Sequence, residues 1–305
     1  MLSGIGPKEH LEQLHIPVIK DLPVGNNLMN HPGVNINFIL KDESARKLMN
    51  IPGRLDVSQL YQYLTTGAGP LAQHYRSVTY LSSPNNPDKD WPNVNWEVAF
   101  YQFPSNLSDF RQFRFGERRH EWAQFLSTYL GRFYIFTHPI VQRVRSRGYV
   151  RLASADPHTP PIINPNFLRD PRDYEDLVFI IKYIYRFYEL SSMAQHLEPL
   201  RPIPGCSFCP KQRYVFECDS YIQCVIEQET YGSYHAVGSN RMGAAERPDT
   251  VVDPYLRVKG VDRLRVCDSS IIPLLMNSNT NAASLMIGEK CAQMVKDEQG
   301  KTYLG

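Results

Sequence analysis

The sequence has no long hydrophobic run, no excess of charge of one sign, and no common hydrolase or phosphate-binding signature. None of its apolar stretches reaches the ~18 residues that a membrane helix needs. The 33 Lys and Arg nearly balance the 31 Asp and Glu, so the net charge does not favour nucleic acid or an anionic membrane as a partner. Neither a Gly-x-Ser-x-Gly sequence nor a glycine-rich loop ending in Lys-Ser or Lys-Thr occurs, which disfavours a serine hydrolase and a P-loop NTPase.

Two local features are also lacking. The opening MLSGIGPKEHLEQL has no basic stretch followed by an apolar core, so we do not expect a secretory signal there. The most basic run, RQFRFGERRH at 111–120, is diluted by acids and is not surrounded by a nucleic-acid-binding module. It is better interpreted as the solvated face of a helix.

The patterns that are present predict an α+β fold with an antiparallel sheet, because the strand-like runs arrive in succession and do not alternate strictly with helices. A chain of 305 residues is long enough for one large domain or two ordinary ones. We expect helices at 7–15, 56–65, 108–129, 172–190, 213–229 and 281–298, strands at 76–82, 93–103, 132–138, 148–154 and 263–268, and a loop at 22–33.

The strongest of these predictions is the helix at 172–190. Its apolar residues recur at helical spacing and form one face, which we interpret as a core-packing stripe: Leu177, Ile180, Ile181, Ile184 and Tyr188.

Four of the six cysteines lie within 19 residues: Cys206, Cys209, Cys218 and Cys224. The first pair has a zinc-like spacing, but the second pair is spaced by six positions, which disfavours a zinc site. Disulfides formed in an oxidising compartment are the better interpretation, and the sequon that begins at Asn106 is compatible with secretion. Apolar surroundings place Cys267 and Cys291 in the core.

The stretch YGSYHAVGSNRMG at 231–243 places His235 between glycines. By spacing alone such a histidine is more often a loop or core residue than a functional one. However, an imidazole with a pKa of ~6.5 is well suited to act as a base.

Three separated segments together favour a functional role for His235. They are SGIGPKEHLEQLHIPVIKDLPVGNNLMNH near the start, RSRGYVRLASADPHTPPIINPNFLRDPRDYEDL in the middle, and HAVGSNRMG with VVDPYLRVKGVDRLRVCDSSIIP and NSNTNAASLMIGEKCAQMV at the end. In this order they resemble the glucose–methanol–choline (GMC) flavin oxidoreductases, and among these the arthropod glucose-dehydrogenase-like branch fits best. The resemblance spans nearly the whole chain.

The resemblance implies an FAD-dependent oxidoreductase that oxidises an alcohol or sugar CH–OH group, with His235 as the catalytic base. Asn279 occupies the position where the family carries a second His or an Asn, and its amide is expected to orient the substrate oxygen. The glycines beside His235 are then expected to leave room for substrate and flavin.

The resemblance also predicts the flavin contacts: Asp268, Ser269, Asn281, Ala282 and Asn27. We expect Asn279 or Asn281 to cap the last helix, whose N-terminus carries a partial positive charge that suits the flavin pyrimidine. Asn27 and His31 are either turn residues or lie close to the cofactor. No metal site is predicted.

The main departure from the family pattern is that no Gly-x-Gly-x-x-Gly sequence occurs in these 305 residues, although the family binds FAD through that loop. The chain starts within a family motif, so we expect it to correspond to the C-terminal portion of such an enzyme. Smaller departures are Ala236 after the histidine, Ser239 and Asn240 in place of Thr-Cys, and Asn30 in place of Asp. These leave open the alternative of a catalytically inactive paralogue that works as a binding protein.

The expected domains follow from the resemblance. Residues 1–35 are a remnant of the FAD-binding domain, 36–230 form the substrate-binding domain, and 231–305 are a catalytic block that returns to the flavin domain. The expected partners are a small alcohol or sugar and an electron acceptor, quinone or oxygen. Nucleic acid and a membrane span are not expected, and the expected location is secreted or extracellular.

Overall fold

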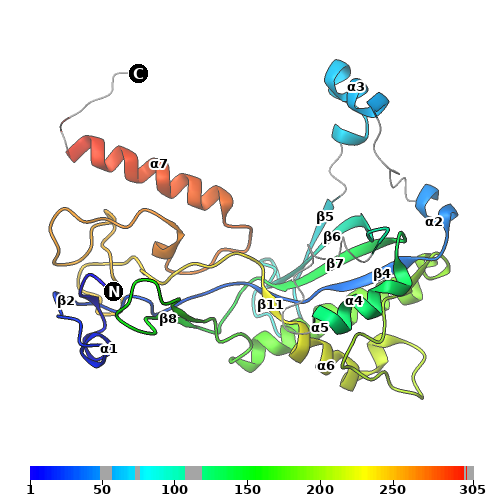
Figure 1. Ribbon diagram of the computed structural model, residues 1–305, viewed down its shortest axis with the longest axis horizontal. Helices are drawn as coiled ribbons and strands as arrows, with labels where there is room; N and C mark the ends of the chain where they lie inside the picture. Colours follow the sequence, from blue (N-terminus) through cyan, green and yellow to red (C-terminus); the bar gives the residue numbers. More distant parts are fainter. Residues whose placement is uncertain (49–56, 73–75, 107–118, 299, 301–305) are drawn as a thin grey trace. The chain divides into compact units, whose positions relative to one another are not determined.

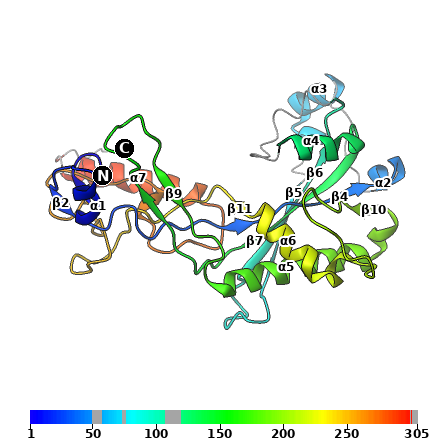
Figure 2. The ribbon, with the colours of Figure 1, turned by 60° about the horizontal axis from the view of Figure 1, so that its bottom comes forward.

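The computed structural model of the chain describes residues 1–48, 57–72, 76–106, 119–298 and 300. The chain divides into two compact units (Figures 1 and 2). Unit 1 comprises 1–32, 141–175 and 231–305, and unit 2 comprises 33–140 and 176–230. The predicted assignment of flavin-binding and substrate-binding roles to 1–35, 36–230 and 231–305 stays a prediction; by compactness, the first and last segments group together and residues 141–175 join them.

Unit 2 is a twisted antiparallel sheet with packed helices. Strand β4 pairs with β7 and β10, and β6 pairs with β5 and β7. The elements are β4 (Ile36–Leu40), α2 (Glu43–Leu48), α3 (Val57–Thr66), η1 (Pro70–Ala72), β5 (Arg76–Leu81), β6 (Val94–Gln102), α4 (Arg119–Leu126), η4 (Ser127–Tyr129), β7 (Phe133–Val141), most of α5 (Pro171–Leu190), η5 (Ser192–Gln195), β10 (Leu197–Pro199), η6 (Val215–Glu217) and α6 (Asp219–Glu229).

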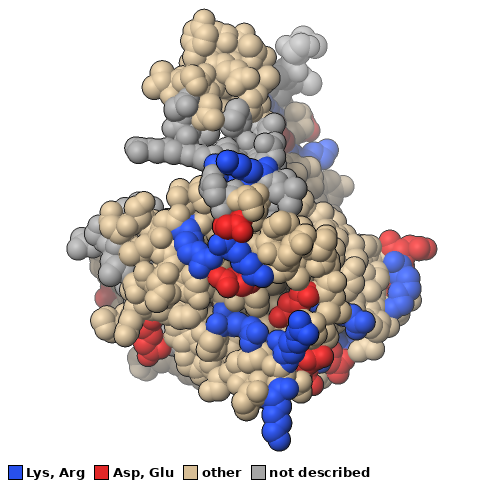
Figure 3. All heavy atoms as spheres, turned by 90° about the vertical axis from the view of Figure 1, so that its right-hand side faces the viewer, with Lys and Arg blue, Asp and Glu red and all other residues tan. Residues whose placement is uncertain are grey.

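The core of unit 2 lies where α5 covers the sheet (Figure 1). The rings of Phe38 on β4 and Tyr188 on α5 lie with centroids 4.3 Å apart. The predicted stripe on this helix is confirmed, because its members are buried: Leu177, Ile180, Ile181, Ile184 and Tyr188. On the face shown in Figure 3, Lys and Arg side chains are interspersed with Asp and Glu.

Unit 1 has fewer regular elements and more loops. They are β1 (Ile5–Gly6), α1 (Lys8–Gln13), β2 (Lys20–Asp21), β8 (Tyr149–Arg151), β9 (Ile162–Asn164), β11 (Tyr231–Gly232), η7 (Ser269–Ile271) and α7 (Asn281–Glu298), while β3 (Pro32–Gly33) begins at its boundary. Strands β8 and β9 form an antiparallel hairpin, visible in Figure 2 beside the label β9. Isolated bridges, such as those between Met29 and Val237 and between Leu28 and Gly148, connect its loops.

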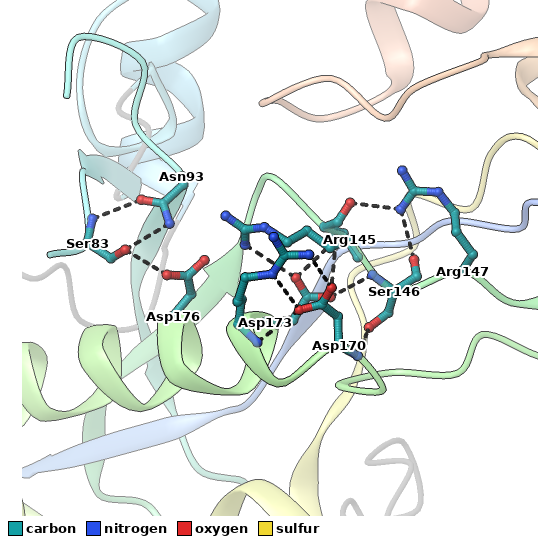
Figure 4. A network of polar contacts seen from close by, with 10 residues as sticks. Ser83, Asn93, Arg145, Ser146, Arg147, Asp170, Asp173 and Asp176 are labelled. Atoms are coloured by element: carbon teal, nitrogen blue, oxygen red, sulfur yellow. Dashed lines mark hydrogen bonds and ion pairs between the residues drawn. The ribbon is translucent and has the colours of Figure 1, made fainter. Parts of the chain in front are cut away.

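Two polar clusters fix the start of α5 and a turn of unit 2 (Figure 4). In unit 1, the fully buried carboxylate of Asp173 accepts hydrogen bonds from the backbone N–H of Arg145, at 3.0 and 3.1 Å, and of Ser146, at 2.8 Å. In unit 2, the Ser83 hydroxyl donates to Asp176 at 2.6 Å. Both aspartates lie on the first turns of α5, so this helix is held by polar contacts at its start.

Several sequence predictions need correction. The predicted strand at 263–268 does not form a regular strand; only Arg265 makes an isolated bridge, with Arg257, and Leu264 is 40% exposed. The helix predicted at 213–229 begins at Asp219, because η6 and a disulfide occupy the residues before it. Of the helix predicted at 108–129, the structure describes 119–129 as α4 and η4, and 107–118 lie outside the described residues.

All six cysteines form disulfides. The predicted disulfides in the 206–224 segment are confirmed, with pairs Cys206–Cys224 and Cys209–Cys218. The predicted core position is confirmed for Cys291, which is buried, whereas Cys267 is only partly buried. The two pair with each other, which the sequence did not predict, and tie the segment before η7 to α7. The described part of the chain contains no helix long and apolar enough to span a membrane.

Candidate active site

His235 lies in unit 1 on a loop that pairs with the segment before β3. Met29 and Val237 exchange two backbone hydrogen bonds of 2.9 Å, and the N–H of Ser233 donates to the carbonyl of His31 at 3.0 Å. The side chain of Asn30 accepts from the N–H of His235 at 2.9 Å. These contacts hold two segments about 200 residues apart in sequence in antiparallel register.

That register brings two imidazole rings into contact. The Nδ1 atoms of His31 and His235 lie 2.9 Å apart, and the ring planes are inclined at 81°. The Nε2 of His31 lies 3.0 Å from the carbonyl oxygen of Met276. The sequence left His31 open as a turn residue or a neighbour of the cofactor, from its place in the DLPVGNNLMNH segment, and did not predict its contact with His235.

Burial favours the neutral form of both rings. Burial, together with the neighbouring His235, lowers the pKa of His31 from 6.5 to about 3. Burial also lowers the pKa of His235 below its ordinary value. Both imidazoles are therefore neutral near pH 7, the state in which a histidine can accept a proton.

The glycines around His235 serve the chain's own packing. A Cβ on Gly232 would meet the side-chain amide of Asn30, and a Cβ on Gly238, whose φ is 90°, would meet the carbonyl oxygen of Asn27. The expectation that these glycines leave room for substrate and flavin is therefore corrected, because the 27–30 segment fills the space beside them.

Asn27 lies against the same loop. It adopts a left-handed conformation with a φ of 60°, which asparagine tolerates better than most residues. Its side-chain amide donates to the carbonyl of Gly238 at 3.3 Å. Asn27 is thus both a turn residue and a neighbour of the histidine loop.

The turn that contains Asp268 and Ser269 packs along the other side of this loop. Asp268 caps η7, where its carboxylate accepts from the N–H of Ser270 at 2.8 Å. The Ser269 hydroxyl donates to the carbonyl of Ala236 at 3.3 Å. The backbone N–H of Asn240 donates to Ser270 O, at 2.8 Å. The structure therefore brings Asn27, His235 and the 268–270 turn together.

Asn279 lies just before α7, and its side chain is exposed. Among the hydrogen bonds of the described residues, none joins it to His235, although Met276, three residues earlier, contacts His31. The helix begins at Asn281, and the carbonyl of Thr280 accepts from Ser284 at 2.9 Å. Thr280 therefore holds the cap position, and the prediction that Asn279 or Asn281 caps the helix was wrong.

The start of α7 presents small, accessible residues. Asn281 and Ala282 are exposed, and the first N–H groups of a helix lack intrahelical acceptors. This long helix can thus receive a negatively charged group at its N-terminus. No group of three or more potential metal ligands occurs among the residues that the structure describes.

Comparison with known proteins shows what this chain is similar to. Residues 144–288 match the model of the GMC oxidoreductase C-terminal family, described as GMC oxidoreductase. The matched range includes His235, the 268–270 turn and the start of α7. Over these residues the chain is similar to the GMC oxidoreductases.

Individual relatives cover almost all of this chain. It is 33% identical over 304 residues to the glucose dehydrogenase [FAD, quinone] of Drosophila pseudoobscura pseudoobscura, which is 98% of this chain and 45% of that protein. It is 31% identical to the alcohol dehydrogenase [acceptor] of Pseudomonas putida, covering 97% of this chain and 48% of that one. A formate oxidase structure from Aspergillus oryzae superposes with a TM-score of 0.72 at 25% identity, over 99% of this chain and 52% of that chain.

These matches confirm the predicted mixed fold with an antiparallel sheet. The chain spans about half the length of the curated relatives it matches.

Proposed function

We propose that this protein is an FAD-dependent oxidoreductase acting on the CH–OH group of an alcohol or sugar. The observation that carries the proposal is the convergence of the 27–31 segment, the His235 loop and the 268–270 turn on one buried, neutral histidine. Similarity to the GMC oxidoreductases supports it, as do relatives named as glucose and alcohol dehydrogenases. The alternative of a non-catalytic binding protein is not favoured by these relatives.

The residues present fit a flavin. Exposed Asn281 and Ala282 at the start of α7 leave helix N–H groups available to the electron-rich edge of its pyrimidine ring. Ser269 and Asn27 contact the histidine loop, and Asp268 lies in the same turn as Ser269. We propose that all three lie close to the same ring system. When bound, FAD supplies the acceptor for the hydride that leaves the substrate carbon.

We propose that His235 acts as the catalytic base. Alcohol oxidation requires the loss of the hydroxyl proton, and a neutral imidazole can collect it. Asn279 follows the segment that contacts His31, and we propose that its exposed amide donates a hydrogen bond to the substrate oxygen. The electron acceptor is proposed to be quinone or oxygen, and three disulfides support a secreted or extracellular location.

The test is the flavin-loaded protein with His235→Ala, mixed anaerobically with glucose and with a panel of primary alcohols. The rate of flavin bleaching should fall about 100-fold or more, the usual worth of a general base. His158→Ala, on an exposed turn, is the matched control and should keep the normal rate. A His235→Ala protein that binds flavin and reduces it at the normal rate would falsify the proposal.

A further inference from the structure

The contact between His31 and Met276 determines where His31 carries its proton. The Nε2 of His31 lies 3.0 Å from the backbone carbonyl oxygen of Met276. A carbonyl oxygen can only accept a hydrogen bond, so this Nε2 must be the N–H donor. In a neutral imidazole the other nitrogen, Nδ1, then has no proton and presents a lone pair.

The position of the proton on His31 determines the position of the proton on His235, because the two rings are in contact. Their Nδ1 atoms lie 2.9 Å apart, a normal hydrogen-bond distance that requires one proton between them. His31 is fully buried, and the groups that favour its charged form are the backbones of Met276 and Gln142 and no carboxylate, so the ring remains neutral. With its proton on Nε2, its Nδ1 accepts from His235. The proton must therefore be on the Nδ1 of His235, and the Nε2 of His235 keeps its lone pair.

The backbone around the rings leaves them little freedom to exchange these roles. His235 is held through its N–H by Asn30, and His31 is held through its carbonyl by Ser233. Bridging between Met29 and Val237 continues the same ladder on the next residues. Both rings are also more than nine-tenths buried, so water cannot easily replace either partner.

We propose that His31 is a positioning residue that fixes His235 as the tautomer with its proton on Nδ1, so that Nε2 is the atom that accepts the substrate proton. The tautomer itself stands on the contacts within unit 1. Its catalytic consequence rests on the proposed function. His31 acts through His235 in the way that a carboxylate fixes the histidine of a hydrolase triad, here with a neutral ring as the acceptor.

The tautomer is measured directly by long-range proton–nitrogen NMR of the ¹⁵N-histidine-labelled chain near pH 7.5. Protonated and unprotonated ring nitrogens differ widely in nitrogen shift, and their couplings to the ring protons distinguish Nδ1 from Nε2. The His235 signals are assigned as those lost in His235→Gln. We expect Nδ1 of His235 to be protonated and Nε2 to be unprotonated. A proton on Nε2 of His235 in the unmodified chain overturns the proposal.

Two substitutions at His31 separate positioning from packing. His31→Phe keeps a ring but removes the acceptor, so His235 should lose its preference for the Nδ1 proton. His31→Asn places an oxygen near the former Nδ1 and should restore that preference. His158→Phe, the same change on an exposed turn, should leave the His235 signals as they are. An unchanged His235 spectrum in His31→Phe contradicts the proposal even if the variant folds well.

The kinetic consequence is read in the flavin-loaded protein. His31→Phe should lower kcat by about 10- to 100-fold, the usual effect of a partner that orients a reacting group, with a smaller change in KM because His31 lies behind His235. His31→Asn should recover most of the loss. If the NMR result holds but His235→Ala still reduces flavin normally, the tautomer assignment survives and the proposed function fails. If His235→Ala abolishes flavin reduction but His31→Phe leaves kcat unchanged, the positioning role fails alone.

Discussion

Units 1 and 2 are stabilised by different means. Unit 2 is built on regular elements, with a sheet covered by α5 and a buried aliphatic stripe along that helix. Unit 1 has short strands of two or three residues, and isolated bridges with side-chain hydrogen bonds join its loops. A regular sheet provides stability, whereas loops can bring side chains from several segments of the chain close together. The candidate site lies in the unit whose backbone is irregular.

From this comparison we expect the largest loss of stability when the apolar core of unit 2 is changed. Leu177→Ala removes a fully buried side chain from α5 and should lower the free energy of unfolding by about 2–5 kcal/mol, since both burial and packing are lost. Leu190→Ala makes the same change at a residue of the same helix that is 51% exposed, and should cost less than about 1 kcal/mol. Urea unfolding followed by fluorescence gives both values. Equal losses would mean that the stripe does not carry the stability of unit 2.

The corresponding prediction for unit 1 concerns a polar contact. Asp173→Ala removes the carboxylate that accepts from a buried N–H, of Ser146, and a partly buried one, of Arg145. It also removes the ion pair with the Arg145 side chain at 3.6 Å. We therefore expect a loss of about 2–3 kcal/mol. Hydrogen exchange of the 141–152 segment should increase more than that of α6, since the loss is local to unit 1.

Asp156→Ala is the matched control for that change. Its carboxylate accepts from the N–H of His158 at 2.9 Å, but on an exposed turn where water can replace it. Its cost should stay below about 1 kcal/mol. If the two alanine variants unfold at the same urea concentration, buried polar contacts do not stabilise unit 1 in the way that the comparison requires.

The same contrast explains how far the sequence could be interpreted. The helix at 172–190 and the strands β5, β6 and β7 of unit 2 were predicted within a few residues, because periodic burial of apolar side chains is visible in one sequence. Strands β4 and β10 of the same sheet were not predicted. The strand predicted at 263–268 was wrong because its apolar residues alternate without a neighbouring strand to pair along them. Local pattern does not report whether a partner strand exists.

The residues of the candidate site also differ in how far the sequence could predict them. His235 was predicted from a resemblance. Asn27 and Ser269 contact its loop, while their predicted contacts with the flavin stay a prediction. His31 was not chosen, because its importance depends on a contact with a residue 204 positions away and on a carbonyl of Met276 still further along. Backbone carbonyls carry no signature in a sequence, so a tautomer fixed by one becomes visible only in three dimensions.

The smallest of the predicted effects is a pH dependence that distinguishes the buried histidine of unit 1 from the apolar core of unit 2. The pKa of His31 falls from 6.5 to about 3 on folding. The unfolded chain therefore binds more protons between these values, so the contribution of His31 is complete above pH 6.5 and is lost as the pH falls toward 3. At pH 5 the loss should be about 2 kcal/mol relative to pH 7.

Urea unfolding at pH 7 and pH 5 measures this slope. His31→Phe should reduce the pH-dependent loss by about 2 kcal/mol, whatever the variant costs at pH 7, because Phe takes up no proton in either state. Leu177→Ala, which removes no titrating group, should keep the whole slope while lowering stability at both pH values. If the free energy of unfolding changes with pH equally in His31→Phe and in the unmodified chain, His31 is not held neutral between His235 and Met276. The irregular backbone of unit 1 would then lack the buried pair of histidines on which its candidate site depends.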